Sequence, residues 1–209
     1  MKREKGFFIT FEGIDGTGKT TQSKLLEDYL AKKGYSVLLT YEPGGTEVGE
    51  RIRDLLLHSR ADISSMTELL LYEASRAQLV EEVIRPALAE DRTVICDRFT
   101  DATLAYQGYG RGLKKETIGF LNEEVTKEIM PDLTFYLDIA PNDKFSKEEI
   151  KDRLEREALS FHRRVREGYL SLARSDPGRI KIIRANQPAE KVGKIIQGYA
   201  EQSIVSRQP

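Results

Sequence analysis

The sequence predicts an α/β fold in which a five-stranded parallel sheet is flanked by helices on both faces. Along the 209 residues, short apolar runs alternate with longer segments of helical periodicity, which is the pattern of parallel strands joined by crossover helices. Most of these runs are rich in Val, Ile, Leu or Phe with little polar alternation, as is typical of strands covered on both faces. No linker-like stretch or internal repeat divides the chain, so we expect a single domain over residues 1–209.

The predicted elements follow one another in a regular order of strand and helix. The short apolar runs predict strands at Phe7–Phe11, Val37–Tyr41, Thr93–Asp97, Thr134–Asp138 and Arg179–Ile183. The helical periodicity covers residues 19–33, 46–58, 67–90, 115–128, 147–174 and 189–200. Gly34 is predicted to end the first helix, because the C′ position favours a left-handed backbone that glycine adopts without strain.

The composition favours a small ligand over a polyanion. The 33 Lys and Arg residues nearly cancel the 34 Asp and Glu residues, which leaves a net charge of −1, whereas nucleic-acid-binding proteins usually carry a strong basic excess. The single cysteine, Cys96, is predicted to be a buried thiol in a reducing compartment. Because the sequence shows neither a signal-like segment nor a run of ~20 apolar residues, we expect no membrane partner and a cytoplasmic location.

A phosphate-binding loop, Gly13-Ile14-Asp15-Gly16-Thr17-Gly18-Lys19-Thr20, directly follows the first predicted strand. Its spacing lets successive backbone N–H groups converge on a phosphate, and its glycines permit a close approach that a Cβ would obstruct. Lys19 supplies a mobile positive charge, and the Thr20 hydroxyl is suited to ligate Mg²⁺. The motif predicts the three-layer P-loop NTPase fold. The residues predicted to bind the phosphates of the nucleotide are Gly13, Ile14, Asp15, Gly16, Thr17, Gly18, Lys19, Thr20 and Thr21.

Two later segments also lie at the carboxyl ends of predicted strands, where a doubly wound sheet binds its ligand. Glu42-Pro43-Gly44-Gly45-Thr46 follows the second strand. Two interpretations of this segment remain open, a simple turn and a functional loop. Asp97 and Arg98 end the third strand, where an unpaired carboxylate would be costly. Asp97 is placed like the acidic residue that holds Mg²⁺ or its waters in phosphoryl transfer, and Arg98 like a phosphate ligand. A purely structural Asp–Arg ion pair is the alternative.

A lid is predicted near residues 141–157, after the fourth strand. The stretch Pro141–Lys147 is polar, and cations follow it that can neutralise a transferring phosphate, with Arg153 the preferred candidate. Acidic residues interleave with these cations at helical spacings, so a solvated face of paired charges is the alternative. The cations of the segment are Lys144, Lys147, Lys151, Arg153 and Arg156.

Several segments together carry a family resemblance. They are Phe11–Thr21, Glu42–Thr46, Leu71-Tyr72-Glu73-Ala74-Ser75-Arg76, Asp97-Arg98-Phe99, Ala105–Gly112 and Pro131–Asp138. With them, the chain resembles the thymidylate kinase family, whose members convert dTMP to dTDP with ATP. The phosphate loop alone would not separate this family from many others, but its combination with Glu-Pro-Gly-Gly, Asp-Arg-Phe and Tyr-Gln-Gly-x-Gly-Arg does.

The resemblance implies how dTMP is recognised. Asp15 corresponds to the residue that accepts a hydrogen bond from the sugar 3′-hydroxyl, and Tyr106 to the ring that excludes a ribose 2′-hydroxyl. Tyr72 corresponds to the aromatic that stacks on thymine, although the residue pattern alone favours a core aromatic. Arg76, one helical turn later, would reach an exocyclic oxygen of the base, and Thr103 would lie near its N3. The residues implied for dTMP binding are Asp15, Glu42, Pro43, Arg53, Tyr72, Arg76, Arg98, Thr103, Tyr106 and Gln107.

The resemblance also implies direct in-line transfer of the ATP γ-phosphoryl group, with no covalent intermediate. Mg²⁺, held by Thr20 and Asp97, would share the charge neutralisation with cationic side chains. Gly16 occupies a position where some members carry an arginine, so the last cation should come from the lid, as in the bacterial type. The residues implied for catalysis are Asp15, Lys19, Arg98 and Arg153, with Arg53 as the clamp on the dTMP phosphate.

Two departures and several alternatives accompany this resemblance. Tyr41 stands where related chains often have arginine, and the lid is several residues shorter than in many bacterial relatives.

The resemblance suggests a homodimer with dTMP and ATP as its small-molecule partners. A kinase for another nucleoside monophosphate or a deoxynucleoside, a GTP-dependent switch and a nucleotide-binding protein without turnover are the rival hypotheses. Arg184 either stacks on adenine or is solvated, and His58 and His162 are given no role.

Overall fold

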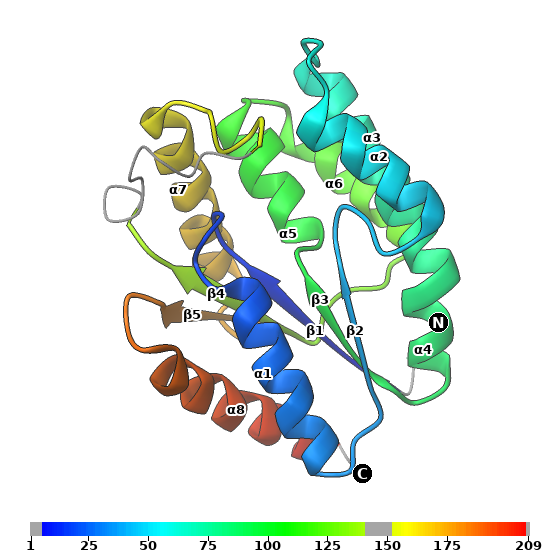
Figure 1. Ribbon diagram of the computed structural model, residues 1–209, viewed down its shortest axis with the longest axis vertical. Helices are drawn as coiled ribbons and strands as arrows, with labels where there is room; N and C mark the ends of the chain where they lie inside the picture. Colours follow the sequence, from blue (N-terminus) through cyan, green and yellow to red (C-terminus); the bar gives the residue numbers. More distant parts are fainter. Residues whose placement is uncertain (1–5, 141–151, 208–209) are drawn as a thin grey trace.

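A five-stranded parallel sheet forms the centre of the computed structural model, which describes residues 6–140 and 152–207 (Figure 1). The strand order is β2-β3-β1-β4-β5, and every neighbouring pair is parallel. The α/β fold and all five strands are confirmed, each to within one residue of the predicted bounds. The strands are β1 (Phe7–Glu12), β2 (Val37–Tyr41), β3 (Thr93–Asp97), β4 (Leu133–Asp138) and β5 (Ile180–Arg184).

The helices connect the strands and end at identifiable caps. Thr46 and Ser64 cap α2 and α3, since each side chain accepts a hydrogen bond from the backbone N–H three residues later. Gly34, at φ 89°, follows the first helix in the left-handed conformation, as predicted. The helices are α1 (Lys19–Lys32), α2 (Glu47–His58), α3 (Ser65–Leu79), α4 (Arg85–Ala89), α5 (Thr100–Thr103), α6 (Lys115–Thr126), α7 (Leu159–Ser175) and α8 (Ala189–Val205), with π-helical segments η1 (Val80–Ile84) and η2 (Leu104–Gly110).

Hydrophobic residues cover the sheet on both faces. Phe7, Ile9 and Phe11 of β1 point toward the side of α1 and α8, where they join a buried cluster with Leu26. Phe8 points to the opposite face and packs in a second cluster, edge to face with Phe99. This alternation explains why the strands read as continuous apolar runs. No helix within the described ranges is both long enough and apolar enough to cross a membrane.

The segment predicted as one helix over 67–90 differs from the prediction. It begins at Ser65 and changes at Val80 into a π-helical turn before α4 continues it. Pro86 lies in the first turn of α4 and has no N–H to donate, which prevents a regular helical ladder across this junction.

Two other regions differ from the predicted helices, and α8 ends at Val205 instead of residue 200. Residues 100–110 are helical, but no helix was predicted there. The glycines of the Tyr-Gln-Gly-Tyr-Gly stretch have low helix propensity and so gave no helical signal in the sequence. The predicted helix over 147–174 begins only at Leu159. Asp152 accepts hydrogen bonds from the backbone N–H groups of Leu154 and Glu155, a local arrangement that competes with helix formation. Residues 147–151 lie outside the described part of the chain.

Candidate active site

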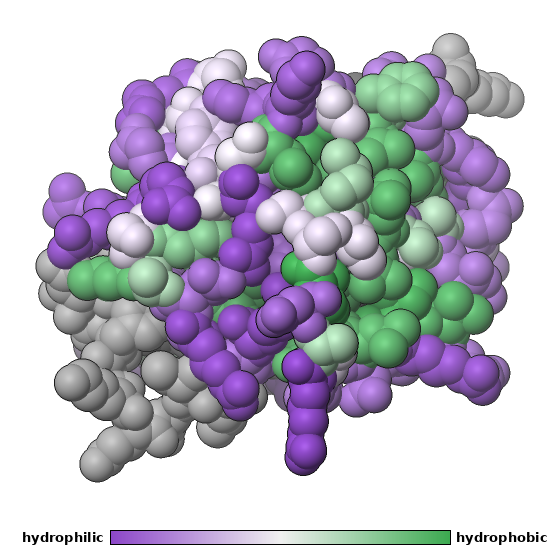
Figure 2. Space-filling view, turned by 90° about the horizontal axis from the view of Figure 1, so that it is seen from above, coloured by the Kyte–Doolittle hydropathy of each residue, from purple (hydrophilic) through white to green (hydrophobic). Residues whose placement is uncertain are grey.

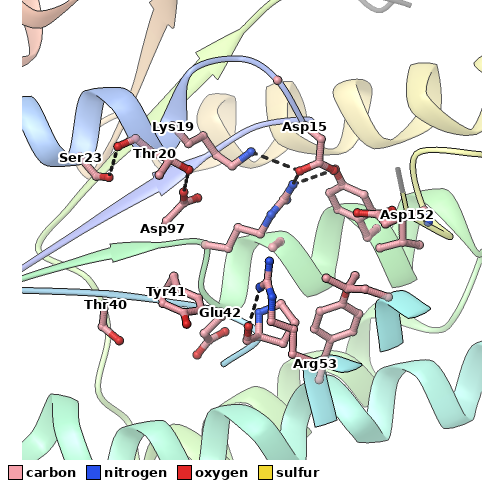
Figure 3. A pocket seen from close by; sticks show the side chains of 18 of the residues that line it. Asp15, Lys19, Thr20, Ser23, Thr40, Tyr41, Glu42, Arg53, Asp97 and Asp152 are labelled. Carbon is pink, nitrogen blue, oxygen red and sulfur yellow. Dashed lines mark hydrogen bonds and ion pairs between the residues drawn. The ribbon is translucent and has the colours of Figure 1, made fainter. Parts of the chain in front are cut away.

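A cavity of about 780 Å³ opens at the carboxyl ends of the strands (Figure 3). Its walls come from the phosphate loop, the ends of β2 and β3, and helical residues of α2, α3, α5 and η2. Neighbouring parallel strands end at the same edge of the sheet, so the segments after β1, β2 and β3 meet there. The three chemistry-bearing motifs of the sequence therefore line one space.

The phosphate loop has the backbone that its glycines predict. Gly13, Gly16 and Gly18 all have positive φ values, and a Cβ on Gly13 would lie 2.7 Å from the carbonyl oxygen of Leu137. The Lys19 ammonium donates a 3.1 Å hydrogen bond to the Ile14 carbonyl. This contact brings the lysine side chain back against the backbone of the loop. Of the predicted phosphate ligands, Gly13, Ile14 and Thr17 are buried and do not line the cavity. Those that line it are Asp15, Gly16, Gly18, Lys19, Thr20 and Thr21.

Thr20 and Asp97 are brought together as predicted. The Thr20 hydroxyl donates a 2.7 Å hydrogen bond to Asp97 Oδ2. A hydroxyl and one carboxylate are oxygen ligands of the kind that Mg²⁺ takes when substrate phosphates and water complete its shell. Within residues 6–140 and 152–207, no group of three His, Cys, Asp or Glu side chains gathers around a metal-sized space. The residues present thus fit a Mg²⁺ ion held jointly by protein and nucleotide.

Asp15 lies at the centre of a charged cluster inside the cavity. Its carboxylate is 2.5 Å from an Arg98 nitrogen and 3.7 Å from the Lys19 ammonium, and the Tyr106 hydroxyl contacts it at 3.4 Å. Burial alone would raise the pKa of Asp15, but these two cations hold that pKa well below its usual range. Asp15 is therefore ionised at neutral pH and acts as a hydrogen-bond acceptor.

The backbone of Arg98 is strained. Its φ of 74° is in the left-handed region, which side chains other than glycine rarely adopt. Two hydrogen bonds hold the turn: Arg98 N–H donates to the Phe11 carbonyl at 2.9 Å, and Phe99 N–H donates to Glu12 Oε1 at 2.8 Å. Glu12 was not predicted from sequence, yet its buried side chain fixes the conformation that turns Arg98 toward Asp15.

Arg53 approaches the cavity from α2 and contacts the turn after β2. Its guanidinium donates a 2.7 Å hydrogen bond to the Pro43 carbonyl and lies 5.4 Å from the centre of the Tyr41 ring. The Tyr41 hydroxyl bonds Glu50 at 2.6 Å, and the Gly45 N–H bonds the same carboxylate oxygen at 2.8 Å. Tyr41, which supplies no charge, thus provides an aromatic surface for Arg53.

Most of the residues predicted to bind dTMP line the same cavity, but Arg76 does not. The Arg76 side chain is 1% exposed, and its guanidinium donates to Glu42, Glu73, Asn122, Thr103 and the Phe99 carbonyl. Every N–H group of the guanidinium therefore has a protein acceptor. The predicted residues that do line the cavity are Asp15, Glu42, Pro43, Arg53, Tyr72, Arg98, Thr103, Tyr106 and Gln107.

Glu42 joins this buried network to the cavity. Its Oε2 accepts two hydrogen bonds from Arg76, at 2.9 and 2.7 Å, while its buried Oε1 has no protein partner. Burial raises the pKa of Glu42 to about 7, in spite of Arg76. Glu73 and Asn122 complete the network. Glu73 lies in the segment that carries the resemblance but was given no role there, and Asn122 was missed because it lies 46 residues from Arg76 with no motif to mark it.

The prediction that Arg153 provides the cation over the transferring phosphate is not supported by its contacts. Arg153 Nη2 lies 2.6 Å from Glu68 Oε2, and its Nε donates to the Leu56 carbonyl at 3.0 Å. The fully buried Glu68 carboxylate therefore binds this guanidinium through a charge-assisted contact. Arg153 itself does not line the cavity, although its neighbours Asp152 and Leu154 do. Lys144, Lys147 and Lys151 lie outside the described residues, and Arg156 is exposed.

Several residues of the site were not found from sequence. Asp152 and Leu154 line the cavity from the segment before α7, and Glu68 lies behind it. The partners of Glu68 are 39 residues or more away in sequence, so no local pattern pointed to it. His162 is buried, and burial lowers the pKa of its ring, whereas His58 lies on the surface beside Asp54.

The comparisons with known proteins agree on one family. The family model described as "Thymidylate kinase" matches residues 11–196. A thymidylate kinase from Thermoanaerobacter sp. (strain X514) is 52% identical over 194 residues, which cover 92% of this chain and 96% of that protein. One from Caldanaerobacter subterraneus subsp. tengcongensis is 50% identical over 202 residues, with 96% and 97% covered. The crystal structure of a thymidylate kinase from Ehrlichia chaffeensis has a TM-score of 0.80 at 38% identity, covering 94% of this chain and 98% of that one.

Proposed function

The chain belongs to the thymidylate kinase family, and from this premise we propose how its residues carry out the phosphorylation of dTMP to dTDP. The observation that supports the proposal most directly is the position of Asp15. This residue of the phosphate loop forms an ion pair at 2.5 Å with Arg98, which follows the neighbouring strand β3 and also lines the cavity. The loop for the donor phosphates and the pocket for the acceptor therefore share one residue.

ATP is the proposed phosphate donor, with its phosphates in the Gly13–Thr20 loop. Thr20 and Asp97 would hold Mg²⁺ together with the phosphate oxygens, and the ion would supply charge neutralisation at the transferring group. Lys19 lines the cavity, and among residues 6–140 and 152–207 its ammonium contacts the Ile14 carbonyl and Asp15. Its ammonium is thereby placed to bind phosphate oxygens when the nucleotide enters.

The acceptor nucleotide is proposed to bind between α3 and η2. Asp15 is ionised and would accept a hydrogen bond from the sugar 3′-hydroxyl. Tyr106, whose hydroxyl contacts both Asp15 and Arg98, would leave no room for a ribose 2′-hydroxyl. Tyr72 presents its ring to the cavity for stacking on the base, and Thr103 and Gln107 lie at the base edge.

The chemistry needs no covalent intermediate. A monophosphate oxygen is already nucleophilic at neutral pH, so the main barrier is the repulsion between two polyanions. Arg53 and Arg98 would bind the acceptor phosphate from two sides and hold it in line with the donor. A further cation from the lid is still proposed. Because Arg153 is bound to Glu68, that role passes to Arg156 or to the lysines before it.

We also propose a homodimer formed through an apolar face of α2, α3 and α6. Figure 2 shows apolar side chains gathered on this side of the molecule. An exposed apolar area of this kind is typical of a protein–protein interface. Sedimentation at micromolar concentration should give a dimer, and Phe120→Asp should give a monomer. The exposed side chains are Val48, Leu55, Met66, Leu70 and Phe120.

We keep the cytoplasm as the proposed location. The one cysteine, Cys96, is a buried free thiol, as is usual in a reducing compartment.

The decisive experiment compares acceptors in one assay of ADP release with ATP and Mg²⁺. dTMP should give the highest kcat/KM among dTMP, dUMP, AMP and thymidine, since the pocket is proposed to recognise both the base and the monophosphate. Faster turnover of AMP would contradict the base assignment. Faster turnover of thymidine would contradict the role of Arg53 and Arg98 at the acceptor phosphate.

A further inference from the structure

Glu68 of α3 is a carboxylate with no exposed surface that binds three different side chains. Its Oε1 accepts hydrogen bonds from Gln107 Nε2 at 2.7 Å and from Arg111 Nε at 3.1 Å. Its Oε2 lies 3.0 Å from Arg111 Nη2 and 2.6 Å from Arg153 Nη2. A buried charge is retained only where its partners are in place, so the three side chains and Glu68 fix one another.

The contact with Gln107 reaches the acceptor pocket. Gln107 is almost fully buried, but it is one of the residues that line the cavity, as are Thr103 and Asp152. Since Glu68 can only accept hydrogen bonds when ionised, it selects the orientation in which the Gln107 nitrogen faces it. The amide oxygen is then left for the cavity, where it can accept a hydrogen bond from a base edge that carries an N–H, as thymine does.

The contacts with the two arginines reach the segment before α7. Arg153 belongs to this segment, and Arg111 also pairs with Glu157 from it at 2.5 Å. Two carboxylates and two guanidinium groups thus form a neutral cluster. Burial would raise the pKa of Glu68, but hydrogen bonds from Arg111 and Gln107 keep that pKa below its usual value. Glu68 remains an acceptor at neutral pH.

We propose that Glu68 is a positioning residue that orients the Gln107 amide for the acceptor base and ties this orientation to the segment that carries Arg153. Glu68 does not touch the substrate and acts only through Gln107. The proposal rests on the proposed function, because it takes the cavity beside Gln107 as the site of the base. A purely structural ion cluster is the alternative explanation of the same contacts.

A double-mutant cycle separates these two explanations. Glu68→Gln keeps the shape of the side chain but offers both a donor and an acceptor. Either the nitrogen or the oxygen of the Gln107 amide can then face residue 68, so the amide is no longer held in one orientation. Loss of a hydrogen bond to a charged group predicts a rise of about tenfold in the KM for dTMP, with the KM for ATP unchanged. In a Gln107→Ala background, the same Glu68→Gln change should raise the dTMP KM less than twofold, because its effect passes through Gln107.

Glu157→Gln is the matched control. It removes the other carboxylate that binds Arg111 but does not touch Gln107, so it should leave the dTMP KM unchanged. If Glu157→Gln raises that KM as much as Glu68→Gln does, the effect passes through Arg111 and the proposal is overturned. Urea unfolding of each variant shows whether the KM changes occur in folded protein.

The cycle also distinguishes failure of this proposal from failure of the proposed function. If Gln107→Ala leaves the dTMP KM unchanged, the base is not bound beside Gln107 and the acceptor site itself is misassigned. If Gln107→Ala raises the dTMP KM but Glu68→Gln raises it by the same factor in both backgrounds, the acceptor site stands. Glu68 is then structural only, and the proposal is overturned.

Discussion

The Thr20 hydroxyl donates a 2.7 Å hydrogen bond to Asp97 Oδ2, although 77 positions separate the two residues in the chain. Thr20 lies in the first turn of α1, after β1, and Asp97 is the last residue of β3. Because β1 and β3 are neighbours in the sheet, the contact follows from the strand order. It assembles the proposed metal ligands before any nucleotide binds.

Asp97→Asn should weaken the binding of Mg²⁺ without unfolding the site. The asparagine oxygen can still accept the Thr20 hydrogen bond, but the charge is lost. We expect the Mg²⁺ concentration for half-maximal rate to rise by about 10- to 100-fold. A Mg²⁺ titration of ADP release measures it, and an unchanged midpoint would remove Asp97 from the metal site.

Tyr41→Leu should raise the KM for dTMP by about two- to fivefold, because a partly exposed cation–π contact contributes roughly 0.5–1 kcal/mol. The ring beneath Arg53 is lost in this variant. Tyr41→Phe keeps the ring and loses only the bond to Glu50, so it is the control and should stay near the parent value. Equal effects of both changes would show that the hydroxyl, and not the ring, positions Arg53.

Arg76→Ala should lower the free energy of unfolding by about 3–5 kcal/mol, since it leaves Glu42 and Glu73 buried without their cation. Arg51→Ala removes an exposed pair with Glu47 and should have no measurable effect. Urea unfolding measures both. The role at the base that the resemblance implies for Arg76 predicts instead a rise in the KM for dTMP with ATP binding largely intact. A fully stable Arg76→Ala protein with a high dTMP KM would restore that interpretation.

Stability should fall with rising pH in part because of Glu42. Burial raises the pKa of Glu42 from 4.5 to about 7, so the folded state holds this proton more tightly than the unfolded chain. The resulting stabilisation is complete below pH 4.5 and is lost as the pH rises to about 7, on the order of 3 kcal/mol in total.

Glu42→Gln has no proton to lose, so its stability should change less steeply between pH 5 and 7. Glu12, whose pKa burial raises to about 8, should still make the variant less stable at higher pH. Urea unfolding at a series of pH values gives both slopes. Identical slopes for the two proteins would mean that Glu42 is ionised in the folded state throughout this range.

Local patterns in the sequence predicted the sheet and the phosphate loop well. Each strand is a single apolar run, and the loop from Gly13 to Thr20 is continuous in the chain. The helices were predicted less well where a side chain competes with the backbone, as Asp152 does before α7. The helix predictions also failed where glycines lie inside a helical segment, as in η2.

The charged networks could not be predicted because they depend on tertiary contacts. Arg76 and Arg153 were selected as ligand-binding cations from their positions, but buried carboxylates from other elements occupy both. Glu68 has no motif of its own, and its partners Gln107 and Arg111 lie 39 and 43 residues away. A cationic side chain beside a motif therefore predicts a ligand-binding residue only where no buried carboxylate of the protein forms an ion pair with it.

The walls of the cavity also divide the sheet into two parts with different freedom to vary. Among residues 6–140 and 152–207, the lining comes from the phosphate loop and α1, from the β2 and β3 ends with their helices, and from Asp152 and Leu154 before α7, whereas none comes from β4, β5 or α8. The strand β5 and the helix α8 are therefore open to exchange. We expect chimaeras that take β5 and α8 from another kinase of this fold to inherit acceptor choice from this chain and to vary only on the donor side.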